Sequence, residues 1–184
     1  AIEELKADPS KWNLGGGGRM GSWGMAFTKL ALEFDMDPSI YSWIASGGAA
    51  PSLTELAAGG IDLAPTSLPE AKTLIDAGKI RALAVMAEKR HPTFPDVPTM
   101  EEVTGKKIVA GAWRAVGAPK GLPDDIKEKY IVALRKVWES EDFKKGMDKF
   151  GYGMDWKQGA ELDAFLADND VNAGKILKAT EGKK

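Results

Sequence analysis

The sequence predicts an α/β fold in which helices cover both faces of a parallel sheet. First, short apolar or β-rich runs alternate with helical apolar spacing over residues 12–86. Second, residues 80–86 form an almost continuous apolar run, which is typical of a strand buried on both faces. Third, turns of glycine and small polar residues follow the first three strand candidates. In doubly wound sheets of this kind, ligands bind beyond the carboxyl ends of the strands.

Strands and helices alternate in the first part of the chain. A helix tail over Ala1–Ala7 is expected to end near Asp8-Pro9, because the residue before a proline avoids helical geometry. The predicted strands cover residues 12–14, 40–44, 61–65 and 80–86. The predicted helices between them run over Met25–Phe34, from Pro51 to Gly59, and from a Thr66 or Ser67 cap to Ala77.

The second part of the chain predicts mainly helices. Residues 92–98 are rich in proline and indicate an extended crossing segment, and residues 108–117 predict a strand. Three helices follow, over Asp124–Trp138, between Ser140 and Gly151, and along an apolar stripe from Leu162 to Leu177. In the first of these helices, apolar side chains recur every four residues at Ile126, Tyr130, Leu134 and Trp138.

Composition argues against several classes of function. The 184 residues carry a formal charge of −2 with Lys and Arg interspersed, so no nucleic-acid partner is expected. The chain has no cysteine, and its single histidine, His91, lies in a predicted exposed turn. Thiol chemistry, a Ser-His-Asp triad, a metal site and a cofactor are therefore not expected. No apolar run is long enough to cross a bilayer, and Glu3 and Glu4 stand where a signal peptide would be basic and then apolar.

The candidate site starts at a strand, glycine turn and helix within residues 12–34. The turn Gly15–Ser22 exposes backbone N–H groups and aims a helix N-terminus at its guest, which favours an anion such as a phosphate or a carboxylate. A flexible glycine linker is the alternative, but an amphipathic helix follows at once. The spacing matches neither a P-loop nor a clean dinucleotide fingerprint. The turns Ala45–Gly48 and Thr66–Ser67 are predicted to lie on the same edge of the sheet.

Several sequence blocks resemble one family of transport proteins. These blocks are Gly59–Ala64, Leu68–Glu70, Ala77–Val85 and Phe94–Thr99, with Trp113-Arg114 before Ala118–Gly121. Their order and spacing are similar to those of the extracytoplasmic solute-binding proteins of tripartite tricarboxylate transporters, the TctC or Bug family. The resemblance covers essentially the whole chain.

The resemblance implies a periplasmic-binding-protein-like architecture of the type II Venus-flytrap kind, with a doubly wound lobe and a partial second lobe. Residues 1–105 would form the second lobe with the carboxylate-binding loops, and residues 106–184 would return to an incomplete first lobe. The family's signal peptide and first carboxylate loop have no counterpart here, so the chain is expected to be a C-terminal portion. The protein would be a periplasmic receptor and not an enzyme. It would capture a small di- or tricarboxylate in the cleft between the lobes and deliver it to membrane permease subunits.

The resemblance also implies ligand-binding residues. In the family, the first loop grips a carboxylate through backbone N–H groups and small hydroxyls. By position, the implied residues are Gly17, Gly18, Arg19, Met20, Gly21, Ser22, Ser46, Gly47, Gly48 and Thr66. This chain departs from the family pattern at Trp23-Gly24 and at Ile44-Ala45, which affects the identity of the ligand more than its class.

Alternatives remain open from the sequence. A doubly wound enzyme could use the glycine loop for a phosphate or nucleotide, with Asp37 as the acidic residue that such a site requires. A sensor domain would use the same carboxylate site. Arg19 could pair with a carboxylate or point to solvent. At least two of the three tryptophans Trp23, Trp43 and Trp113 are expected to lie in the hydrophobic core. The exposed helix stripes of the truncated chain predict self-association.

Overall fold

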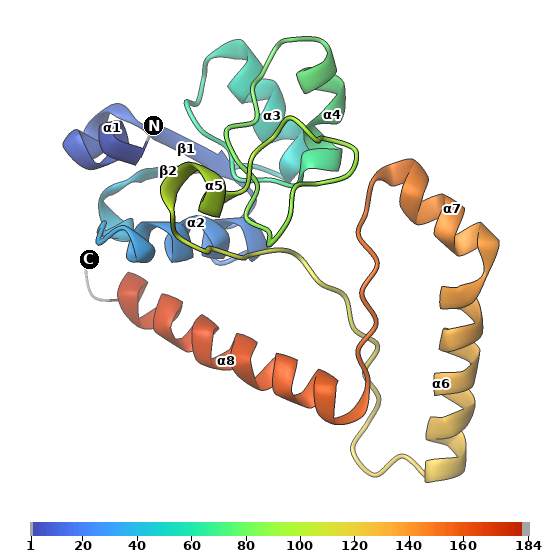
Figure 1. Cartoon of the computed structure of the whole chain (residues 1–184). Helices are drawn as coiled ribbons and strands as arrows, with labels where there is room; N and C mark the ends of the chain where they lie inside the picture. Colours follow the sequence, from blue (N-terminus) through green and yellow to red (C-terminus); the bar gives the residue numbers. More distant parts are fainter. Residues whose placement is uncertain (1, 182–184) are drawn as a thin grey trace. The chain divides into compact units, whose positions relative to one another are not determined.

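The computed structural model describes residues 2–181 and forms two compact units (Figure 1). One unit contains residues 1–112 and 158–184, and the other contains Trp113–Lys157. The predicted boundary between residues 105 and 106 concerns the lobes of a whole two-lobed protein, and it stays a prediction.

The first unit is built on a parallel sheet with β1 at its centre. β1 (Asn13–Gly16) pairs with β2 (Ser42–Ala45), and Gly16 lies level with Ala45. On its other side, β1 forms a parallel bridge from Leu14 to Leu63, and the Gly15 N–H donates to the Leu63 carbonyl at 2.9 Å. The sheet order is therefore β2, β1 and the segment around Leu63, as at the start of a 2-1-3 doubly wound sheet.

Helices follow each of these segments, as the sequence predicts. Figure 1 shows α2 on one side of the sheet and α3 and α4 on the other. The helices of this unit are α1 (Ile2–Ala7), α2 (Ser22–Glu33), α3 (Ala49–Ala58), α4 (Leu68–Asp76), α5 (Met100–Thr104) and α8 (Gly159–Glu181), with the short 3-10 helices η1 (Pro9–Lys11) and η2 (Pro38–Ile40). The final helix α8 contacts α2 and η2.

Local chemistry explains where the helices begin and end. Gly59 ends α3 with a φ of 80°, a left-handed conformation that glycine adopts without a steric cost. The helix α5 is absent from the sequence prediction. It begins with a capping box, in which the Thr99 side chain accepts from the Glu102 N–H and the Glu102 carboxylate accepts from the Thr99 N–H. The Thr-x-x-Glu spacing at 99–102 was the available signal.

The hydrophobic core lies between the sheet and the helices α1 and α2. Its buried members are Leu5, Leu14, Phe27, Ala31, Met36 and Tyr41. The Tyr41 hydroxyl donates to the Leu5 carbonyl at 3.1 Å, which satisfies both groups inside the core. Trp43 packs against this core, whereas Trp113 is 45% exposed. Of Trp23, Trp43 and Trp113, only Trp43 joins this core within the described residues. The expectation that at least two of these tryptophans lie in the core was therefore too high.

Three predicted strands are shorter in the structure or absent from it. Residues 61–65 form only the Leu14–Leu63 bridge, and Pro65 offers no N–H to extend the ladder. Residues 80–86 form only the bridge from Val85 to Thr99, because three of the facing residues 92–98 are prolines and the Phe94 and Val97 N–H groups donate within turns. Residues 108–117 have no strand assignment, and residues 111–117 are exposed. A strand requires a partner of matching length, which periodicity alone does not supply.

The second unit contains α6 (Asp124–Glu139) and α7 (Glu141–Phe150). Trp138 lies with its ring centroid 5.8 Å from Phe143 and 5.6 Å from Trp156, and the Arg135 guanidinium lies 4.4 Å from the Trp156 ring centroid. Neither helix has a buried residue, and Tyr130 of the predicted stripe is 58% exposed. The predicted self-association stays a prediction.

Candidate functional site

The ends of three parallel segments place the predicted turns on one edge of the sheet. Continuing the β1–β2 register by one residue puts Ser46 level with Gly17. The segment around Leu63 also runs parallel to β1, so the turns that follow β1, β2 and this segment leave the sheet at the same edge. The Ser46 N–H donates to the Gly16 carbonyl at 2.7 Å, which closes this edge between β1 and β2.

The loop Gly17–Ser22 is held at its start, within its turn and at Arg19. At its start, the Trp43 indole Nε1 donates to the Gly17 carbonyl at 3.0 Å. Within the loop, the Gly21 N–H donates to the Gly18 carbonyl at 2.8 Å, which forms a tight turn. The Arg19 guanidinium donates to the Pro38 carbonyl of η2. One donor of Arg19 is therefore used within the protein, and its predicted role in ligand binding is a proposal.

Two glycines outside the predicted set give this loop its shape. A Cβ at Gly24 would lie 2.0 Å from the backbone oxygen of Arg19, so the loop packs directly on the first turn of α2. A Cβ at Gly16 would lie 2.7 Å from Cζ2 of Trp43, so the indole ring rests on the Gly16 backbone. Gly16 lies within the predicted turn Gly15–Ser22, and Trp43 was one of the three tryptophans considered. Sequence reasoning missed the contact of Trp43 with the loop and the packing role of Gly24, for which the glycine pattern was the one signal in the sequence.

Several donors at the loop have no acceptor among the described residues. They are the Gly18 N–H, the N–H groups of Ser22, Trp23 and Gly24 in the first turn of α2, and the Ser22 hydroxyl. The first backbone N–H of α2 with a bond is that of Met25, which donates to Gly21 at 2.9 Å. Unpaired N–H groups at a helix N-terminus attract an anion through both hydrogen bonds and the helix dipole.

The second turn uses its serines mainly within the protein. The Ser46 hydroxyl lies 2.9 Å from the Gly16 carbonyl, 2.9 Å from the Gly48 carbonyl and 2.5 Å from the Ser52 hydroxyl. Gly48 has a φ of 144°, which an L side chain rarely adopts, and it begins α3. The turn therefore joins the end of β1 to the start of α3, and its ordering depends on Ser46.

The third turn is organised by Glu70 of α4. The hydroxyls of Thr66 and Ser67 both donate to the Glu70 carboxylate, the first at 3.3 Å. Ser67 is the N-cap residue, but its side chain bonds Glu70 and not a backbone N–H. The sequence therefore predicts the position of the cap correctly, but the Ser67 side chain does not make the hydrogen bond to a backbone N–H that a cap usually makes. Asp62 has a structural role, since its carboxylate accepts from the Asn13 N–H at 2.8 Å.

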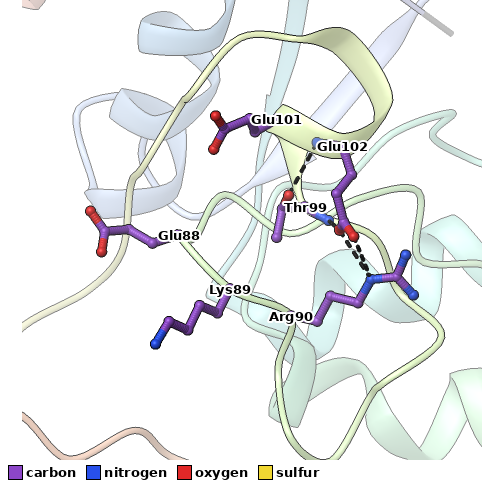
Figure 2. A pocket seen from close by; sticks show the side chains of 6 residues that line it. All are labelled: Glu88, Lys89, Arg90, Thr99, Glu101 and Glu102. Atoms are coloured by element: carbon purple, nitrogen blue, oxygen red, sulfur yellow. Dashed lines mark hydrogen bonds and ion pairs between the residues drawn. The ribbon is translucent and has the colours of Figure 1, made fainter.

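An open pocket of about 250 Å³ lies elsewhere and contains no predicted site residue (Figure 2). It is lined by Glu88, Lys89, Arg90, Thr99, Glu101 and Glu102. Figure 2 shows Glu102 bonded to both Arg90 and Thr99. The Thr99 N–H, and then Arg90, hold the pKa of Glu102 below its usual value, although partial desolvation opposes them. Within this pocket, Arg90 and Glu102 form an ion pair, Glu88 pairs with Lys107 outside it, and the capping box of α5 uses the Glu102 carboxylate.

Residues 2–181 contain no group of three or more His, Cys, Asp or Glu side chains that could hold a metal ion. In the same range, no helix combines the length and apolar character that a membrane span requires. Asp37, the acidic residue of the nucleotide alternative, accepts from the Ser39 N–H at 3.0 Å at the start of η2.

Comparison with known proteins gives consistent matches. Residues 1–181 match the family model described as "Tripartite tricarboxylate transporter family receptor". Protein BugT of Bordetella pertussis is 38% identical over 144 residues, which cover 74% of this chain and 42% of BugT.

Two solved structures share the fold of this chain. A TctC solute-binding protein from Polaromonas has a TM-score of 0.71 and 26% identity, over 97% of this chain and 60% of that protein. MatC from Rhodopseudomonas palustris, solved with bound malate, has a TM-score of 0.73 and 20% identity, over 97% of this chain and 60% of MatC. These likenesses confirm the predicted α/β fold class. The chain spans roughly half the length of these proteins.

Proposed function

Because the chain belongs to the tripartite tricarboxylate transporter receptor family, we propose that it supplies carboxylate-binding loops of an extracytoplasmic solute receptor. The ligand is a small di- or tricarboxylate, and the receptor works in the periplasm with the membrane permease subunits of the transporter. The family comprises solute-binding receptors and not enzymes, which agrees with the prediction that the chain is not an enzyme.

One observation supports this proposal above the others. The loop Gly17–Ser22 and the first turn of α2 offer backbone N–H groups and one hydroxyl that have no acceptor within residues 2–181, at an open glycine backbone and a helix N-terminus. A carboxylate fits this set because it only accepts hydrogen bonds, and each charge-assisted bond contributes about 1.5–3 kcal/mol. Ser46, Gly47, Gly48 and Thr66 complete the proposed site as the walls beside this loop. The hydroxyls of Ser46 and Thr66 are already bonded within the protein, so these walls shape the site more than they bind the ligand.

The test is a titration of the chain with malate and citrate, in which nuclear magnetic resonance spectra monitor the backbone amides. This method detects weak binding, and it reports each glycine amide separately. The proposal predicts that the Gly18 and Ser22 amides shift most. A diol without carboxylates serves as the negative ligand. If the largest shifts fall outside the three turns, the proposed site is wrong.

Gly18→Val tests the loop directly. A Cβ at Gly18 meets no atom within 4 Å, so valine fits the folded protein while its methyl groups block the approach of a ligand to the backbone. Loss of one charge-assisted bond weakens binding by roughly 10- to 100-fold. Gly111→Val is the matched control, because Gly111 is equally open and lies outside the loop. Equal malate affinity in the Gly18→Val protein would show that the loop does not contact the ligand.

The neighbouring genes distinguish transport from sensing. Permease genes beside the gene for this chain support delivery to a transporter. A signalling gene in their place would argue for a sensor with the same ligand site.

A further inference from the structure

Trp43 of β2 fixes the orientation of the first peptide group of the loop. Its indole Nε1 donates to the Gly17 carbonyl at 3.0 Å. The ring itself is held on two sides. It packs against the hydrophobic core with its centroid 6.3 Å from that of Phe27, and it rests on Gly16, where a Cβ would lie 2.7 Å from Cζ2. The hydrogen bond therefore comes from a ring that has little freedom to move.

The bond to Gly17 also determines where the Gly18 N–H points. The peptide between Gly17 and Gly18 is trans, and in a trans peptide the carbonyl and the following N–H point in opposite directions. Since the Gly17 carbonyl faces the indole, the Gly18 N–H faces away from it. Among the described residues, no group accepts from this N–H, and a Cβ at either glycine would meet no atom within 4 Å. Gly18 is exposed, so its N–H is available to a ligand from solvent.

We propose that Trp43 is a positioning residue for carboxylate binding, because it keeps the Gly18 N–H directed at the ligand. Gly17 and Gly18 lack a Cβ that would restrict their backbone, so without the indole the peptide between them can turn over. A turned peptide presents the Gly17 carbonyl oxygen to the carboxylate, and two negative oxygens repel one another. Trp43 thus converts a flexible backbone into a fixed donor without touching the ligand. This role rests on the proposed function, and it assigns a task to a residue on the neighbouring strand.

The experiment compares the Trp43→Phe and Trp12→Phe variants of the 184-residue chain. Both changes remove an indole N–H from a tryptophan that packs against the same core, but only Trp43 bonds the loop. Gly16→Ala is a second variant that disturbs the same bond from the other side, by pushing the ring away. For each protein, malate affinity, the position of the Gly18 amide resonance before malate is added, and thermal stability are measured.

We expect Trp43→Phe and Gly16→Ala to weaken malate binding by about tenfold or more, as for the loss of one charge-assisted bond. Both should also move the Gly18 amide resonance in the free protein, a signature that a packing role alone would not produce. Trp12→Phe should bind as the wild type does. Wild-type affinity and an unmoved Gly18 resonance in folded Trp43→Phe protein would overturn the role of Trp43 alone. If the wild type and Trp12→Phe show no malate-induced shift, the proposed function itself fails, and the role of Trp43 fails with it.

Discussion

Replacement of Gly24 by alanine tests whether the loop packs on α2 as described. A Cβ at this buried position would lie 2.0 Å from the Arg19 carbonyl oxygen. The Arg19 backbone must move by about 1 Å before the contact reaches 3.0 Å, the closest approach that Cβ atoms tolerate. A backbone atom cannot avoid the clash by changing rotamer, so the turn between Gly18 and Gly21 has to deform. Overpacking of this kind costs about 1–3 kcal/mol.

Alanine also stabilises a helix relative to glycine, which opposes this cost. The gain is roughly 0.5–1 kcal/mol. Gly174→Ala is therefore the matched control, since Gly174 lies within α8 and a Cβ there meets no atom within 4 Å. Both variants gain the helix contribution, so the difference between them isolates the clash. We expect Gly174→Ala to be slightly more stable than the wild type, and Gly24→Ala to be less stable than Gly174→Ala by about 1–3 kcal/mol.

Thermal denaturation measures this difference. For a chain of this size, 1 kcal/mol corresponds to about 2–4 °C in Tm. The glycine amides of the loop should shift in Gly24→Ala and stay in place in Gly174→Ala. Equal or higher Tm for Gly24→Ala than for Gly174→Ala would refute the direct packing of the loop on α2.

Two further predictions concern the supports of the site. Tyr41→Phe should lower the free energy of unfolding by about 1 kcal/mol in urea denaturation, because it removes the donor to the Leu5 carbonyl. Burial, and then Asp37, raise the pKa of Tyr41, so its contribution is present below the unfolded pKa and is lost as pH rises through the raised value. If the Tyr41→Phe protein loses stability at alkaline pH as much as the wild type does, ionisation of Tyr41 is not the cause of that loss. Thr99→Ala should lower the free energy of unfolding by about 1 kcal/mol, because it removes the helix cap of α5. The pKa of Glu102 is lowered, so the capping box should stabilise the protein above about pH 4.5 and weaken as pH falls below it. In Glu102→Gln, this decrease in stability at acid pH should disappear. If the stability of Glu102→Gln depends on acid pH as that of the wild type does, the capping box does not titrate in this way.

The local features of the fold could be read from the sequence. The starts and ends of α2, α3, α6 and α7 depend on caps and on apolar spacing within one segment, and all four lie within a few residues of the predicted bounds. The glycine turn after β1 was recognisable because glycine is the residue that such a turn needs. The family was also recognisable, because short blocks of sequence carry that resemblance.

Strand pairing depended on contacts that periodicity does not describe. The run of residues 80–86 has the composition of a buried strand, yet it makes one bridge, because the segment beside it is rich in proline. The apolar side chains of α6 follow a helical stripe, but the stripe alone does not say what covers it, and Tyr130 is exposed in this chain.

The sequence by itself determined the α/β class, the glycine loop and the edge of the sheet on which the candidate site lies. These follow from residue types and their spacing along one chain segment. Only the tertiary structure decided which donors are free at that edge. Arg19, Ser46 and Thr66 bond partners within the protein, whereas the Gly18 N–H and the Ser22 hydroxyl have none among the described residues. The physical reason is that a hydrogen bond is satisfied by proximity in space. The bonded groups are 19 residues apart for Arg19–Pro38, 30 for Ser46–Gly16 and 26 for Trp43–Gly17, whereas Thr66 and Glu70 are only four apart.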